Sequence, residues 1–270
     1  MMTNWISATC EANNIRIHYT RTGGNKPPLI LLHGLMTNGL CWSDLAGKLE
    51  QDYDVIMPDA RGHGLSSQPN GKYRYGDLAE DINGLINALQ LTKPSLLGHS
   101  MGGMTAAVLA GMEPAMLGGL ILADPTFLSP RMQQEVYSSN VFDQHRQMLT
   151  MSFEEIVADG RRRHPQRPLH IIETFARARL QTCMDALDIL RPPNPDYKEL
   201  VRHMKIPGLL IYGDKGVVNT ILATELRILN PHLAVEQIPG ARHALHLDQP
   251  ELFYKAIKSF FDAIETRHIH

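Results

Sequence analysis

Gly98-His99-Ser100-Met101-Gly102 is the stretch of sequence that decides the fold. It follows the apolar segment 95–97 and precedes a segment rich in small side chains, 105–112, that has helical character. A serine flanked by glycines in this way suits a tight turn between a strand and a helix, because glycine lets the two backbones approach closely. Such a turn would hold the Ser100 hydroxyl above the edge of a sheet. The alternative is an ordinary glycine-rich turn in which Ser100 caps the helix.

Short apolar strands and amphipathic helices alternate on both sides of this turn. Strands are expected at 15–19, 29–32, 54–58, 117–123, 208–212 and 234–238, and helices at 42–49, 78–89, 220–229 and 250–264. The continuously apolar runs at 29–32 and 54–58 are typical of strands that are buried on both faces. This alternation predicts an α/β fold with right-handed crossovers and a mostly parallel, doubly wound sheet.

Residues 126–203 lack the strand pattern and carry helical patterns instead. We therefore expect an α/β core, made of 1–125 and 204–270, and a helical cap, 126–203, that lies over the strand ends. The methionines of the cap could line an adaptable apolar pocket or pack between its helices. The basic run at 161–164 could attract a carboxylate-bearing substrate, although a solvated helix face accounts for it as well.

Composition limits the classes of protein to which the chain can belong. The 270 residues are 43% hydrophobic and 20% charged, which is enough for one large domain with a proper core. The net charge of −2 gives no electrostatic reason to bind nucleic acid or an anionic membrane. The three cysteines, Cys10, Cys41 and Cys183, form neither a disulfide framework nor a zinc motif. We expect a small-molecule substrate, no metal, and a monomer or homodimer.

The ends of the chain show no targeting pattern. The N-terminal stretch lacks the basic and apolar regions of a secretory signal, and no apolar run approaches the roughly 18 residues that span a bilayer. These features predict a cytoplasmic protein. Residues 267–270 are expected to form a frayed tail.

A serine hydroxyl needs a base within hydrogen-bonding reach to act as a nucleophile. Of the 13 histidines, His33 follows the first buried strand and His243 follows the last one. The order nucleophile, acid, base along the chain favours His243. His246 lies three residues further on and is the less favoured alternative. His33 is expected to brace its loop rather than to take part in catalysis.

The third member of such a triad is a carboxylate that orients the imidazole. Asp124 ends the strand after the serine turn, and Asp214 follows the next strand. Both lie in loops at strand ends, so the residues alone leave the choice between them open. Asp248 is a weaker third candidate, and we expect it to cap the terminal helix. The oxyanion would be held by the backbone N–H groups of Leu35 and Met101.

Four motifs together resemble the α/β-hydrolase superfamily of serine hydrolases. They are His-Gly-Leu at 33–35, Asp-Ala-Arg-Gly-His-Gly-Leu-Ser at 59–66, Gly-His-Ser-Met-Gly-Gly at 98–103 and Gly-Ala-Arg-His at 240–243. The resemblance extends over about residues 13–265. It implies an α/β-hydrolase fold, a Ser-His-acid triad, no cofactor, and a cap that shapes the substrate pocket. It also implies that the 59–66 motif is a structural loop.

The sequence departs from the family pattern after the strand at 208–212. The family has Gly-x-x-Asp at this point with the aspartate as the triad acid, whereas here Gly216 takes that position. Relatives that lack this acid use the carboxylate at the end of the preceding strand, which implies Asp124. In this respect the chain is similar to the N-formylmaleamate deformylase type of amidohydrolase.

The resemblance implies a hydrolase, and the leading reaction is hydrolysis of a small carboxylic ester or lactone through an acyl-enzyme. Amide hydrolysis, as in a deformylase, or C–C bond hydrolysis would use the same triad. A receptor that binds a ligand without turnover is the alternative from another class. The presence of both Ser100 and His243 argues against that alternative.

Overall fold

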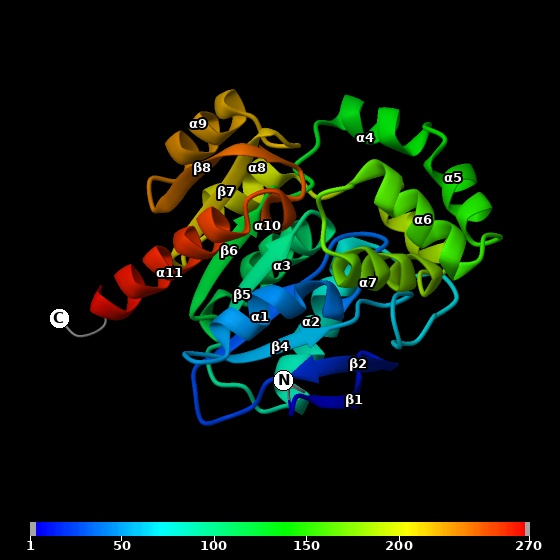
Figure 1. Cartoon of the computed structure of the whole chain (residues 1–270). Coiled ribbons are helices and arrows are strands. Elements are labelled where there is room, and N and C mark those ends of the chain that lie inside the picture. The colour runs from blue at the N-terminus through cyan, green and yellow to red at the C-terminus, as the bar shows by residue number, and fades with distance from the viewer. Residues whose placement is uncertain (1–3, 268–270) are drawn as a thin grey trace.

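A single eight-stranded sheet forms the centre of the computed structural model, which describes residues 4–267 (Figure 1). The strand order is β1-β2-β4-β3-β5-β6-β7-β8. β1 and β2 pair antiparallel, as do β2 and β4, and all later pairs are parallel. The predicted mostly parallel α/β sheet is therefore confirmed. The expected frayed tail lies outside the described residues apart from Arg267, where the last helix ends.

The strands are β1 (Ile6–Ala12), β2 (Ile15–Arg21), β3 (Pro28–Leu32), β4 (Asp54–Pro58), β5 (Ser95–His99), β6 (Gly119–Ala123), β7 (Gly208–Lys215) and β8 (Leu233–Arg242). The core helices are α1 (Ser43–Leu49), α2 (Tyr75–Ala88), α3 (Met101–Met112), α9 (Thr220–Leu229), α10 (Leu245–Asp248) and α11 (Pro250–Arg267), with short 3-10 turns η1 (Gly39–Trp42) and η2 (Pro114–Met116).

Alternate residues of each central strand enter two separate cores, one on each face of the sheet. In β3, Ile30 and Leu32 pack into the core that α2, α3 and α9 cover. Leu29 and Leu31 pack into the core that α1 and α11 cover. Both faces are thus buried, which is why the central strands read as continuous apolar runs.

Several elements differ from the predictions. β7 extends to Lys215, so the expectation that Asp214 lies in the loop after this strand is wrong. Two other differences have clear physical reasons. β1 was not predicted, because it is an edge strand whose inward-facing residues, Ala8, Cys10 and Ala12, are small and only Ala12 is buried, so its alternation gives a weak apolar signal. α3 begins at Met101, four residues earlier than expected, although Gly102 and Gly103 are poor helix formers. The close packing of that first turn against the sheet compensates for their low helix propensity.

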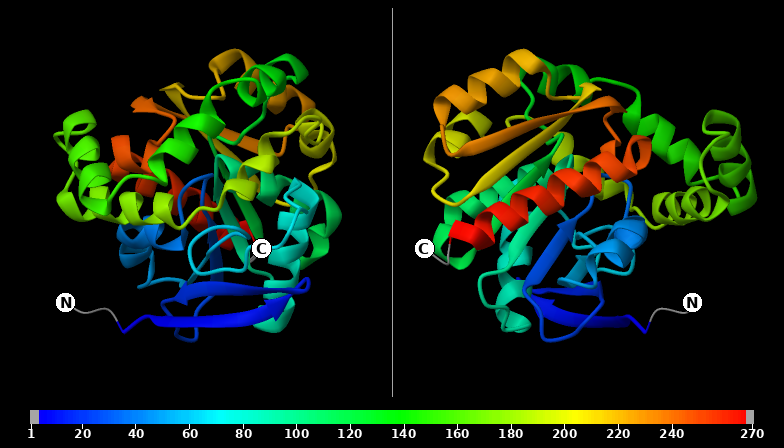
Figure 2. Two further views of the ribbon diagram at one scale, coloured as in Figure 1. Left: turned by 90° about the vertical axis from the view of Figure 1, so that its right-hand side faces the viewer. Right: turned by 60° about the vertical axis from the view of Figure 1, so that its left-hand side comes forward.

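The chain between β6 and β7 is helical. It forms α4 (Pro130–Tyr137), α5 (Val141–Met148), α6 (Phe153–Arg163), α7 (Leu169–Leu180), the 3-10 segment η3 (Met184–Leu190) and α8 (Tyr197–His203). Helices α4–α7 form a group to one side of the sheet in Figure 1 and in the right-hand view of Figure 2. α7 packs against η1, at the carboxyl end of the sheet, whereas α8 packs against α3 and α9 of the core.

Candidate active site

Ser100 lies on a sharp turn between β5 and α3. Its backbone is in a region that side chains rarely adopt, with φ 55° and ψ −117°. A Cβ on Gly98 would lie 2.7 Å from the Gly103 nitrogen, and a Cβ on Gly102 would lie 2.7 Å from the His33 carbonyl oxygen. Only glycine fits at both positions, so the flanking glycines are what allow this turn to form. Strain of this kind is typical of functional sites.

Ser100, His243 and Asp124 form a continuous hydrogen-bonded chain. Ser100 Oγ lies 3.0 Å from His243 Nε2, and His243 Nδ1 lies 2.5 Å from Asp124 Oδ2. With the proton on Nδ1, the imidazole donates to the carboxylate and accepts the hydroxyl proton of the serine. Asp124 is fully buried, whereas the His243 side chain is 42% exposed. The imidazole therefore has one side fixed by the protein and one side open to an incoming molecule.

The loop after β7 encloses the Asp124 carboxylate. The backbone N–H groups of Val217 and Val218 each donate to one of its oxygens at 2.9 Å. A Cβ on Gly216 would lie 2.5 Å from Asp124 Oδ1 and 2.6 Å from its Cγ. The glycine that replaces the usual family aspartate thus leaves the space in which the Asp124 carboxylate sits.

Asp214 and Asp248, the other two candidate acids, have different partners. Asp214 accepts hydrogen bonds from the Gly240 backbone at 2.6 Å and from Gln237 Nε2 at 3.1 Å. Asp248 accepts from the Arg242 backbone at 3.0 Å and pairs with Arg167 at 3.2 Å. Asp248 ends α10 and does not cap α11, so the expected helix cap is wrong. Neither carboxylate is hydrogen-bonded to an imidazole among residues 4–267.

The loop after β3 lies directly against Ser100. A Cβ on Gly34 would lie 3.4 Å from the Ser100 Cβ, so the Leu35 amide that follows belongs to this side of the site. Met101, the other expected oxyanion donor, is the first residue of α3, where backbone N–H groups have no helical partner. Leu35 thus follows a residue that packs against Ser100, and Met101 directly follows Ser100 in the chain.

Two buried histidines hold this loop in place. His33 donates from Nδ1 to the Gly34 carbonyl at 2.8 Å and accepts at Nε2 from the Ala60 amide at 2.9 Å. His63 Nε2 accepts from the Met36 amide at 3.2 Å. Burial lowers the pKa of His33, and it lowers the pKa of His63 to about 3, so both rings are neutral at pH 7. Both ring nitrogens of His33 are thus engaged in holding the loop.

His99 supports the base from behind, a role that the sequence did not reveal. Its Nε2 donates to the His243 backbone carbonyl at 2.8 Å, and the two rings lie 4.7 Å apart. Burial holds the pKa of His99 well below its usual range, so it stays neutral. The His246 ring packs against Trp42 at 4.6 Å. The structure therefore places His243, not His246, at the serine hydroxyl.

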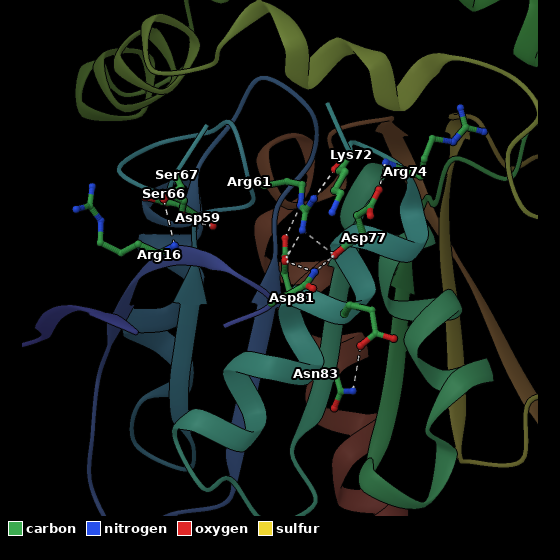
Figure 3. A network of polar contacts seen from close by, with 12 residues as sticks. Arg16, Asp59, Arg61, Ser66, Ser67, Lys72, Arg74, Asp77, Asp81 and Asn83 are labelled. Atoms are coloured by element: carbon green, nitrogen blue, oxygen red, sulfur yellow. Dashed lines mark hydrogen bonds and ion pairs between the residues drawn. The ribbon is translucent and has the colours of Figure 1, made fainter. Parts of the chain in front are cut away.

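The 59–66 motif joins the site to the core through two buried charges (Figure 3). Asp59 accepts from His18 Nδ1 at 2.8 Å and from the Gly39 and Leu65 amides at 2.8 and 2.9 Å. Arg61 forms a bidentate pair with Asp81 of α2, at 2.6 and 2.5 Å. These contacts fix the turn on which His63 sits.

Comparison with known proteins agrees with this geometry. A family model described as the alpha/beta hydrolase fold matches residues 27–202. The chain belongs to the α/β-hydrolase family. It is 31% identical to N-formylmaleamate deformylase of Pseudomonas putida, over 97% of this chain and 98% of that protein. It is 27% identical to 2-(acetamidomethylene)succinate hydrolase of Mesorhizobium japonicum, over 96% of each protein.

A solved structure, the crystal structure of E-2-(acetamidomethylene)succinate hydrolase, superimposes with a TM-score of 0.84 at 25% identity. The match covers 96% of this chain and all of that one. The protein is therefore a hydrolase of the α/β type, as the sequence predicted. Within residues 4–267, no helix of this hydrolase is both long and apolar enough to cross a bilayer.

Proposed function

We propose that this hydrolase cleaves small carboxylic esters or lactones through a Ser100-His243-Asp124 triad and an acyl-enzyme. The observation that supports this proposal is the hydrogen-bonded chain from Ser100 Oγ through the imidazole to the buried carboxylate. These three residues supply a nucleophile, a base and a group that orients the base.

In the acylation step, Ser100 Oγ attacks the carbonyl carbon while His243 Nε2 takes the hydroxyl proton. Asp124 keeps the imidazole in the tautomer that accepts at Nε2, and it stabilises the imidazolium that forms. The charge on the carbonyl oxygen is held by the N–H groups of Leu35 and Met101, each worth roughly 3 kcal/mol in the transition state. His243 then protonates the leaving alcohol, and the C–O bond breaks.

Deacylation repeats these steps with water in place of the serine. His243 takes a proton from a water molecule that attacks the acyl carbon, and it returns this proton to Ser100 Oγ as the acid leaves. Apart from the substrate and water, every group that takes part in these steps belongs to the chain. We also propose that residues 126–203 act as the cap that shapes the substrate pocket and that 1–125 and 204–270 form the core.

Amide hydrolysis is the second candidate, because one relative over nearly the whole chain is named as a deformylase. The triad would act in the same way on a formamide or an amide. C–C bond hydrolysis is a further alternative. A panel of 4-nitrophenyl esters, lactones, N-formyl amides and vinylogous diketones separates these reactions by the ratio of their kcat/KM values.

The decisive variant is Ser100→Ala, which is expected to abolish turnover while the protein keeps its circular dichroism spectrum and melting temperature. Unchanged turnover in this variant would refute the assignment. A fluorophosphonate probe tests the receptor alternative in the same protein. Labelling of Ser100 supports an enzyme, whereas a folded protein that takes no label supports a receptor.

A further inference from the structure

A cavity of about 520 Å³ lies among the helices between β6 and β7. α5 contributes Met148 to its wall, α6 contributes Asp159 and Arg163, and α7 contributes Arg179. The core contributes Met36, which follows Leu35 in the loop beside Ser100. The cavity therefore adjoins the loop that we propose to hold the oxyanion.

Arg179 in this wall has no anionic partner in the part of the chain that the structure describes. It is half-buried near the end of α7, and burial lowers its pKa from the ordinary arginine value. Its Nη1 lies 3.8 Å from Met36 Sδ and 3.7 Å from Met148 Sδ, and thioether sulfurs are weak acceptors. No carboxylate of the described chain lies within ion-pair distance of this guanidinium. Arginines removed from water are normally paired with an anion.

The other charged groups around the cavity do not neutralise Arg179. Asp159 is already engaged by Arg162 at 3.0 Å and by Arg163 at 2.8 Å. His145 donates from Nε2 to a backbone carbonyl, and burial and the nearby guanidinium lower its pKa, so the ring is neutral. The cavity thus presents a positive charge with unused hydrogen-bond donors beside an apolar wall.

We infer that Arg179 binds a carboxylate group of the substrate, so the substrates of this hydrolase carry an ionised carboxyl group in addition to the bond that is cleaved. A guanidinium fork matches a carboxylate with two parallel hydrogen bonds. The two methionine side chains would pack against the apolar part of the same molecule. The reaction at this substrate rests on the proposed function, whereas the binding of a carboxylate at Arg179 does not.

Calorimetric titration with adipate tests the binding site without any turnover. Arg179→Met is the main variant, because a methionine side chain fits between Met36 and Met148 and the substitution removes only the guanidinium. Arg161→Met is the matched control, because it removes the same charge as Arg179→Met. Arg161 is exposed on α6 and has no ion pair in the described chain. Arg179→Met is expected to weaken adipate binding by about 10-fold or more, because the hydrogen bonds to the charged group are lost, and Arg161→Met by less than about twofold. Equal weakening in both variants, or no saturable binding, would overturn the inference.

Kinetics with paired esters tests the same site in the reaction. Mono-4-nitrophenyl adipate carries the carboxylate on the acyl side and 4-acetoxybenzoate carries it on the leaving group, and each has a neutral methyl ester as its partner. Arg179→Met is expected to lower kcat/KM for one charged ester by roughly 10- to 100-fold and for its neutral partner by less than about threefold. Equal losses for charged and neutral esters would overturn the inference. If no ester is hydrolysed while adipate binding still depends on Arg179, the proposed reaction fails and the carboxylate site stands.

Discussion

Gly216→Ala should damage catalysis by moving the buried acid, although it adds only one methyl group. The new Cβ would lie 2.5 Å from Asp124 Oδ1, whereas ordinary contacts of a Cβ are 3.4 Å or longer. Either the carboxylate or the loop after β7 must therefore move by roughly 0.9 Å. His243 Nδ1 is bonded to this carboxylate, so a shift of Asp124 is passed on to the imidazole and to its contact with Ser100.

The expected loss in kcat follows from the size of this displacement. Misplacing a catalytic group by about 1 Å costs on the order of 100-fold in rate. The shift also weakens the hydrogen bonds that Val217 and Val218 donate to the carboxylate. Bonds to a charged group are worth roughly 1.5–3 kcal/mol each, so the free energy of unfolding should fall by about 2 kcal/mol.

The assay compares kcat on the best ester of the panel with the unfolding curve in urea. Gly47→Ala is the matched control: it lies in α1, and a Cβ at this position would meet no atom within 4 Å. The control should keep kcat within twofold and gain roughly 0.5–1 kcal/mol of stability, because alanine is the better helix former. If Gly216→Ala retains kcat within threefold of the wild-type value, the reasoning that the added methyl group displaces a catalytic Asp124 carboxylate is refuted.

Two further results are expected. Asp124→Asn should lower kcat by about 10³- to 10⁴-fold, because the amide no longer fixes the imidazole tautomer. Asp214→Asn should leave kcat within about threefold of the wild-type value. The reverse ranking of the two variants in steady-state assays would show that Asp214 is the acid. The pKa of His63 is about 3 in the native protein. Below about pH 6.5 the His63 ring therefore binds a proton in the unfolded chain but not in the native protein, so the free energy of unfolding falls as the pH is lowered. Urea unfolding of His63→Gln between about pH 4 and 6 should show a slope smaller than that of the wild type by about 1.4 kcal/mol per pH unit, and an unchanged slope would contradict a buried neutral ring.

The parallel sheet and the serine turn could be predicted because their signals are local. A strand that is buried on both faces, such as β3, is recognisable from a short run of apolar residues. The serine turn is likewise recognisable from the glycines next to Ser100. β1 could not be predicted in this way, since the inward-facing residues of this exposed edge strand are small and mostly half-buried, which leaves only a weak apolar signal. Its position depends on pairing with β2, which only the folded chain shows.

The site was predictable only in part, because much of it depends on contacts between distant segments. The choice of Asp124 over Asp214 rested on family resemblance, and the reason for it lies in the space at Gly216. The role of His99 behind His243 joins residues 144 positions apart. The sequence drew attention to the basic run at 161–164 because its charges are adjacent. Arg179 is one of two arginines in the last turn of α7, and the lack of a carboxylate beside it in the described chain becomes visible only when its surroundings are known.

The central claim is that Ser100 becomes acylated during turnover, and mass spectrometry tests it most directly. The enzyme is quenched in acid while it hydrolyses 4-nitrophenyl acetate, digested, and searched for acetylated peptides. We expect an acetyl group on Ser100 in the wild type and neither acetylation nor turnover in Ser100→Ala. Turnover that continues in Ser100→Ala, or an acetyl group that forms at catalytic rate on another residue, would contradict it.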